Sequence, residues 1–266
     1  MRNKNGFKRF CQALLLAWLS IFVLSSCSSR PEISAGAQDK AQAAGLVEEA
    51  DKLYKERAEL SRTREAILML RRAVAADTES YDAAWRLSRL NYFLGAHTKD
   101  EAERDRAYSE GVEAGRRAVK IQGGKAEGHF WLGANLGGQA QTSLLSGLTA
   151  VDEIRREMQK VIQLDEGFQG GSAYMALGQV DLEAPRMMGG DSKRAVEVLE
   201  KGLRFGENNT SYRLRLAQAY MAVGRTEDAR RQLDLIINST PDPDYLPEHG
   251  DALSGARKLL TKLEGK

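Results

Sequence analysis

The 266-residue sequence predicts an all-α fold made of repeated helix pairs, a helical-repeat solenoid. No proline occurs between Pro31 and Pro185, and Ala, Leu, Glu, Arg and Lys dominate this stretch, with apolar residues three to four positions apart. No segment shows the alternation of β-branched residues that a sheet requires. Small residues recur at one position in successive segments, so we predict about four to five helix pairs, a C-terminal capping helix and essentially no strand.

Residues 1–26 are predicted to be a signal peptide. Four basic residues and no acidic residue precede an apolar stretch at 13–24, which is too short to span a bilayer comfortably. The basic residues are Arg2, Lys4, Lys8 and Arg9. The segment ends in Leu24-Ser25-Ser26-Cys27, which resembles the lipobox of bacterial lipoproteins. The resemblance implies that Cys27 is lipidated and begins the mature chain, and the alternative is an uncleaved signal anchor.

Residues 27–38 are short of bulky apolar side chains and contain Pro31, so we predict a lipidated tether ahead of a helical-repeat domain at 39–266. Ser28 follows the cysteine, and in lipoproteins of this kind a residue other than Asp at that position implies sorting to the outer membrane. We therefore expect a protein of the bacterial cell envelope that its N-terminal lipid anchors to the outer membrane, facing the periplasm.

Composition argues against nucleic acid as a partner. The chain has 39 basic and 37 acidic residues, and the signal removes four basic ones, so 35 against 37 remain, a formal charge of −2. Basic pairs such as Arg71-Arg72 and Arg116-Arg117 are interpreted as solvated helix faces. The two cysteines are Cys11 in the signal and Cys27, so no disulfide is expected in the domain.

The clearest repeat begins at Arg213. The residues that follow match the tetratricopeptide repeat in type and in spacing. In order, the pattern is a leucine followed by a small residue, an aromatic residue, a glycine, a small residue, a large residue, an apolar residue and a proline. They are Leu216-Ala217, Tyr220, Gly224, Ala229, Leu233, Ile236 and Pro241. This resemblance implies two antiparallel helices joined by a short turn.

Earlier segments repeat the pattern with interruptions. The small position recurs as Ser88, Gly133, Gly178 and Ala217, because two helices approach closely only where the side chains at their crossing are small. Triplets typical of second helices are Ala66, Leu70 and Ala73, then Ile154, Met158 and Val161, then Ala195, Leu199 and Gly202. Insertions near Gly95, Thr142 and Met187 must lengthen the helices or their turns. A last helix at 251–263 is expected to cap the array.

Residues of chemical interest form no catalytic or metal-binding pattern. The histidines His97, His129 and His249 lie far apart, and neither Cys-x-x-Cys nor His-Glu-x-x-His spacing occurs. His129 is interpreted as a packing or capping residue. Glycine doublets such as Gly189-Gly190 lack the lysine and hydroxyl residue of a phosphate-binding loop. We expect no enzymatic activity, no cofactor and no metal.

In tetratricopeptide arrays the first helices line a concave groove, where eight residues here are candidates for binding a partner. The residue three before each small position is apolar, and polar residues follow on the next turns. The apolar stripe is Trp85, Phe130, Met175 and Leu214, and its polar companions are Arg89, Tyr92, Gln179 and Gln218. Such a stripe suits an amphipathic helix, an extended peptide or an apolar ligand. The equally weighted alternative is that the insertions cover it.

A further resemblance rests on two tracts, Phe130-Trp131-Leu132-Gly133 and Ala184-Pro185-Arg186-Met187-Met188-Gly189-Gly190-Asp191. Together with the lipobox and the irregular repeats over about 45–263, they resemble the T-component lipoproteins of tripartite ATP-independent periplasmic (TRAP) transporters. The resemblance implies a periplasmic scaffold that binds a solute-receptor protein, with homo-oligomerisation and passage of an apolar or organic-acid ligand as further options. The units are also similar to those of eukaryotic regulators of microtubule dynamics, so the shared property is a fold and not a function.

Three functions follow as hypotheses. The first is a lipid-anchored adaptor for the solute receptor of a TRAP-type transporter. The second is a general scaffold for envelope assembly. The third is a carrier of a small apolar ligand in the groove.

Overall fold

The computed structural model describes residues 35–142, 144–241 and 246–264. The compact unit discussed below is Gln38–Lys266. The expected signal peptide, the lipidation site Cys27 and residues 27–34 of the expected tether lie outside the described residues, so those expectations remain predictions.

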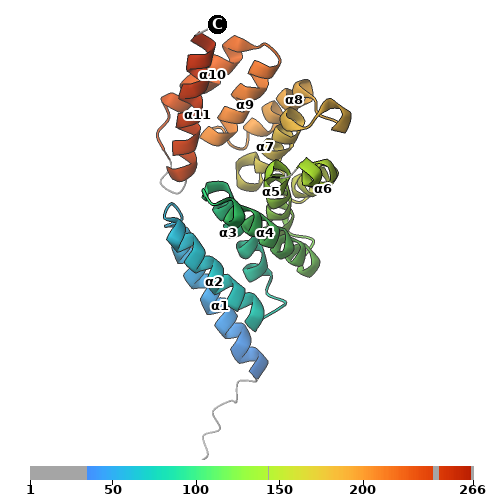
Figure 1. Cartoon of the computed structure of the whole chain (residues 1–266), viewed down its shortest axis with the longest axis vertical. Coiled ribbons are helices and arrows are strands. Elements are labelled where there is room, and N and C mark those ends of the chain that lie inside the picture. Colours follow the sequence, from blue (N-terminus) through green and yellow to red (C-terminus); the bar gives the residue numbers. More distant parts are fainter. Residues whose placement is uncertain (1–34, 143, 242–245, 265–266) are drawn as a thin grey trace, which may run out of the picture. The chain divides into compact units, whose positions relative to one another are not determined.

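The described residues form eleven α-helices and one short 3-10 helix, without a strand among them, which confirms the all-α prediction (Figure 1). The helices are α1 (Ala35–Tyr54), α2 (Leu60–Ala76), α3 (Tyr81–His97), α4 (Glu101–Ile121), α5 (Ala126–Thr142), α6 (Leu144–Leu164), α7 (Phe168–Glu183), η1 (Arg186–Met188), α8 (Ser192–Leu203), α9 (Thr210–Ala222), α10 (Thr226–Ile237) and α11 (Leu246–Glu264). None of the described helices is both long enough and apolar enough to cross a bilayer.

Several helices begin where a polar side chain accepts a hydrogen bond from the first turn. Ser80 accepts from the amide of Ala83, and Asp100 accepts from that of Glu103. Asn209 does the same for Tyr212. Such caps satisfy backbone N–H groups that have no partner inside the helix, so they fix where these helices begin.

Consecutive helices pair in the order that the repeats predict. The first unit, α1 and α2, contributes to one buried cluster with α3 and α4. The following pairs are α3 with α4, α5 with α6, α7 with α8 and α9 with α10, and α11 packs on the last pair. Buried side chains form three successive large clusters, over α1 to α4, α4 to α7 and α7 to α11. Because adjacent clusters share a helix, each pair is buried by its neighbours, which is the packing of a helical-repeat solenoid.

The recurring small residues lie at the closest helix crossings. A Cβ atom on Gly133 would stand 2.3 Å from Cε of Met158, and one on Gly178 would stand 2.5 Å from Cγ of Leu199. In the α3–α4 pair, the Ser88 hydroxyl donates a 2.7 Å hydrogen bond to the carbonyl of Gly111. Small residues therefore set these crossings, as predicted.

The insertions are accommodated in two ways. In the second and third pairs the helices themselves are longer, with 17 to 21 residues in α3 to α6 against 12 or 13 in α8 to α10. The insertion near Met187 is instead an excursion at 184–191 that contains η1 and returns at Asp191. Side chains at 142–149 lie outside the described set.

The capping helix is longer than predicted. It begins at Leu246, five residues before the expected start at 251, because Pro247 falls in the first turn, where a missing N–H and a fixed φ angle do no harm. Ala252 and Ala256 of α11 are buried against the last pair, and Gly255 lies against Leu214 of α9. The predicted capping role is therefore correct, although the predicted start was wrong.

Candidate partner-binding surface

The first helices of the last four pairs lie in a row. Helix α3 packs against α5, α5 against α7 and α7 against α9. We call this set the first-helix row. It carries all eight residues predicted to bind a partner, three on α3, one on α5 and two each on α7 and α9.

The predicted apolar stripe is largely packed within the array. Phe130 is only 7% exposed, with its ring 4.9 Å from that of Trp131 and 5.3 Å from that of Phe168. Trp85, Met175 and Leu214 are partly buried against the core clusters. Phe130 is therefore buried, whereas the other three apolar residues keep part of their surface exposed, as the four polar companions do.

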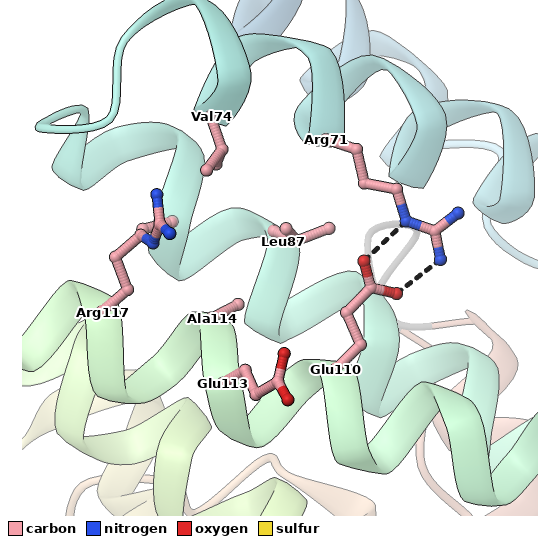
Figure 2. A pocket seen from close by; sticks show the side chains of 8 residues that line it. Arg71, Val74, Leu87, Glu110, Glu113, Ala114 and Arg117 are labelled. Carbon is pink, nitrogen blue, oxygen red and sulfur yellow. Dashed lines mark hydrogen bonds and ion pairs between the residues drawn. The ribbon is translucent and has the colours of Figure 1, made fainter.

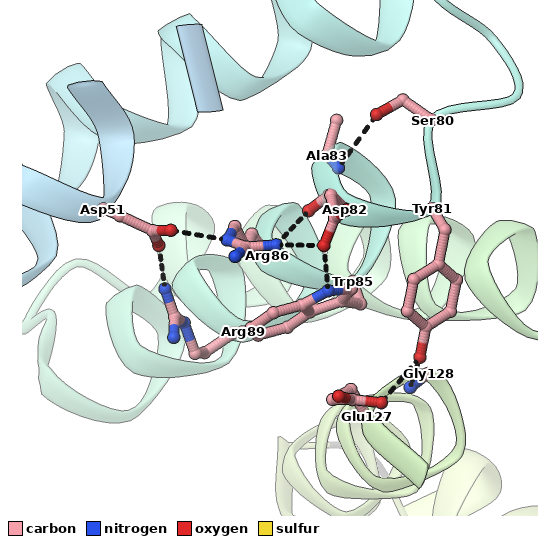
Figure 3. Close-up of polar contacts among 10 residues, drawn as sticks. All are labelled: Asp51, Ser80, Tyr81, Asp82, Ala83, Trp85, Arg86, Arg89, Glu127 and Gly128. Carbon is pink, nitrogen blue, oxygen red and sulfur yellow. Dashed lines mark hydrogen bonds and ion pairs between the residues drawn. The ribbon is translucent and has the colours of Figure 1, made fainter. Parts of the chain in front are cut away.

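A cluster on α1 and α3, which we call the cation–aromatic cluster, is made of Asp51, Tyr54, Trp85, Arg86 and Arg89. Figure 3 shows all of these residues except Tyr54. Asp51 bridges the two arginines, accepting 2.7 Å from Nε of Arg86 and 2.8 Å from Nη2 of Arg89. The Arg89 guanidinium lies 3.8 Å from the ring centre of Tyr54 and 4.9 Å from that of Trp85. Stacking of this kind holds a planar cation in one orientation.

Arg89 is the most deeply held cation of this cluster. Its side chain is 13% exposed, and among the described residues its Nε atom is buried without a hydrogen-bond partner. Burial lowers the pKa of Arg89, while Tyr54 and Asp51 oppose that shift. Since a guanidinium stays charged in proteins, Arg89 holds a positive charge with one N–H donor still to satisfy.

A second group, the amide cluster, joins α5, α7 and α9. It comprises Gln141, Gln179, Glu183, Arg215 and Gln218. Gln179 and Gln141 donate to the two oxygens of Glu183 at 3.0 and 3.3 Å, and Arg215 donates to Oε1 of Gln218 at 3.1 Å. The nearest atoms of Arg215 and Glu183 are 4.0 Å apart. Amide side chains that keep free donors and acceptors can pair with the backbone of an extended segment.

Tyr92 lies on α3, one turn after Arg89. Its ring is 5.7 Å from that of Trp131 and 6.3 Å from that of Tyr108. Burial raises the pKa of Tyr92, the charge of Arg215 lowers it by less, and the charge of Glu183 raises it further. The phenol is therefore neutral near pH 7 and within electrostatic reach of the amide cluster.

The structure thus brings the predicted polar residues into two groups and adds members that sequence reasoning missed. Asp51 and Tyr54 come from α1, 38 and 35 positions before Arg89. Glu183 and Arg215 lie on the same helices as Gln179 and Gln218, at spacings of four and three, so helical periodicity could have pointed to both.

Two shallow hollows lie away from the eight predicted residues. One, of about 220 Å³, lies among α2, α3 and α4 and is lined by Val74, Leu87, Glu113 and Arg117 together with Arg71, which binds Glu110 (Figure 2). The other, of about 280 Å³, is lined by Phe93, His97, Pro247 and their neighbours. Both are small and bordered by charge or a titratable ring, which does not favour an apolar ligand.

His129 has the packing role predicted for it. Nδ1 is 2.6 Å from Oε2 of Glu157, and Nε2 is 2.9 Å from the carbonyl oxygen of Gly123. Both partners are acceptors, so the ring satisfies them fully only as the imidazolium, and the hydrogen bond to Glu157 raises the pKa of His129 against the effect of burial. No cluster of metal ligands occurs in the described part of the chain.

Family models match two parts of the sequence. One described as "Regulator of microtubule dynamics protein 1-3" matches residues 46–178, half of the chain. One described as "Tetratricopeptide repeat" matches residues 187–246. No curated protein matches the chain.

Solved structures share the fold. TTC0263, a thermophilic TPR protein in Thermus thermophilus, is 17% identical with a TM-score of 0.59, over 79% of this chain and 98% of that one. PilF of Pseudomonas aeruginosa is 19% identical with a TM-score of 0.56, over 85% of this chain and 93% of that one. At such identities the likeness establishes a tetratricopeptide fold and leaves function to the surface.

Proposed function

We propose that this chain, which belongs to the family described as "Regulator of microtubule dynamics protein 1-3", is a scaffold for a protein partner. We further propose that the partner is the solute receptor of a TRAP-type transporter. Arrays of this fold bury their helix pairs against one another and present an extended face for recognition.

The observation that carries the proposal is the polar face of the first-helix row. Within the described part of the chain, the buried Nε–H of Arg89 has no partner, and its guanidinium stacks on the rings of Tyr54 and Trp85. The amide cluster lies along the same row on α5, α7 and α9. An arginine beside aromatic rings has the composition of an interaction hot spot, and the part of the Arg89 guanidinium that remains exposed could meet an acidic group on the partner.

The choice of a solute receptor rests on the resemblance of residues 184–191 and of the lipobox at Cys27 to those of T-component lipoproteins. A lipid at Cys27 would hold the scaffold on the outer membrane facing the periplasm, where such receptors move. The test of anchoring is a Cys27→Ala variant, which is expected in the soluble periplasmic fraction. Membrane fractionation equal to that of the wild type would contradict a lipid anchor.

The proposed partnership is tested with the soluble body, residues 28–266, and purified solute receptors encoded near its gene. Calorimetry is expected to give saturable binding with a Kd of about 10 μM or tighter. If no receptor binds, the receptor assignment fails. Crosslinking in cells would then name the partner of a general envelope scaffold, and native mass spectrometry would reveal a bound apolar ligand.

A further inference from the structure

The insertion at 184–191 is a candidate for a second contact surface, away from the eight residues of the first-helix row. It contains Met187, which is 93% exposed, more than any other large apolar residue in the described part of the chain. Leu68, the next, is 56% exposed. A single exposed apolar residue needs no explanation by itself, but Met187 stands on a loop that many contacts hold in place.

The loop is held by a buried carboxylate. Asp181 of α7, only 2% exposed, accepts from Nε and Nη2 of Arg194 at 2.9 and 2.5 Å and lies 2.6 Å from Nη2 of Arg155. The same two arginines both donate to the carbonyl oxygen of Gly189 in the loop. Side chains from α6, α7 and α8 therefore converge on one point of the loop.

The backbone of the loop is also fixed. The amide of Asp191 donates 2.8 Å to the carbonyl of Asp181, and the amides of Met188 and Gly190 both donate to the carbonyl of Pro185. Gly189 has φ +79°, and a Cβ on Gly190 would stand 1.8 Å from the carbonyl oxygen of Ala184. These glycines permit a turn that other residues would not, and the hydrogen bonds hold the loop in that turn.

Ordering this loop costs conformational entropy. Burial of Met187 does not offset that cost, because the loop holds the Met187 side chain in water. Two basic residues, Arg186 and Lys193, lie on either side of Met187 in the sequence, and both are exposed. The structure gives neither side chain an ion pair with another described residue, whereas Arg155 and Arg194 are paired with Asp181. The exposed methionine is therefore accompanied by two cations that remain open to a partner.

We propose that the 184–191 loop is a docking knob that inserts Met187 into an apolar pocket of a partner protein, rimmed by carboxylates that meet Arg186 and Lys193. A flexible thioether side chain adapts to such a pocket, and a rigid loop removes the ordering penalty on binding. The inference rests on the proposed scaffold function, but not on the partner being a solute receptor.

The test begins with a photo-crosslinking amino acid placed at 187 in the full chain in living cells, with position 68 as the reference. A protein crosslinked from 187 and not from 68 is identified, purified and titrated against the soluble body. Met187→Asp should weaken binding about tenfold or more, the loss expected when one large apolar contact is removed. Met187→Leu should retain binding, and Leu68→Asp should leave it unchanged.

Preorganisation is tested with Gly190→Ala, which keeps Met187 but cannot keep the turn. It should weaken binding while the circular dichroism spectrum stays that of the wild type. Equal crosslinking from 187 and 68, capture of lipid or of a second copy of this chain, or full affinity in Met187→Asp would each overturn the docking knob. If the first-helix row does not bind a solute receptor, the crosslink at 187 and the titration of the crosslinked protein are unaffected. The receptor proposal and the docking-knob proposal can therefore fail separately.

Discussion

Replacing Asp181 by Ala should destabilise the protein more than any change to its exposed ion pairs. Asp181 receives three charge-assisted contacts from Arg155 and Arg194, between 2.5 and 2.9 Å, and is almost completely buried. Breaking a buried pair costs about 3–5 kcal/mol. Arg194 is 43% and Arg155 19% exposed, so both can partly rehydrate, and we expect roughly 2–4 kcal/mol.

The assay is thermal and urea unfolding of the soluble body followed by circular dichroism. For a domain of this size, 1 kcal/mol corresponds to about 2–4 °C in Tm, so Asp181→Ala should lower Tm by roughly 5–15 °C. The matched control is Glu153→Ala, which removes the exposed partner of Arg116 and should cost less than about 1 kcal/mol. If the two variants lose the same stability, the buried carboxylate does not organise the 184–191 loop.

Two further predictions concern the packing of the array. The folded-state pKa of His129 is raised chiefly by its hydrogen bond to Glu157, so its contribution to stability is complete below the unfolded pKa of about 6.5 and is lost as pH rises through the folded value. The free energy of unfolding of the wild type should therefore exceed that of the His129→Gln variant, and the difference should be larger at low pH than at high pH. A difference that does not change with pH would contradict this. Gly178→Ala should destabilise by about 1–3 kcal/mol because the new methyl group would meet Leu199, whereas Gly137→Ala, with nothing within 4 Å, should stabilise slightly through helix propensity. Equal effects of these two substitutions on denaturant midpoints would refute the assigned helix crossing.

The helix pairs could be predicted from the sequence because their signals are local. The small residue of a first helix and the large residues of the following helix that pack on it recur at similar positions from pair to pair, as with Gly178 on α7 and Leu199 on α8. The predicted start of α11 was wrong because the closely spaced Pro241, Pro243 and Pro247 favour a turn, whereas a helix tolerates a proline such as Pro247 in its first turn.

The surface chemistry was less accessible from sequence. The eight groove residues were chosen by position in the repeat, which gives the right helices but not which side chains remain open. Phe130 is buried because Trp131 and Phe168 pack on it, and Asp51 reaches Arg89 from another helix pair. Arg194 binds Asp181, and Arg155 binds the carbonyl of Gly189 in the 184–191 loop. These contacts join residues across an insertion, where the periodicity of the repeat no longer predicts which residues meet.

The central claim, that the polar face of the first-helix row binds the partner, is tested most directly by comparing two matched double variants. Arg89→Gln with Arg215→Gln alters the row, and Arg64→Gln with Arg71→Gln removes two cations from α2 that bind Glu103 and Glu110. Titration of the solute receptor should show the first variant at least about tenfold weaker than the wild type and the second within about twofold. Equal affinity for all three proteins, with circular dichroism unchanged, would contradict the claim.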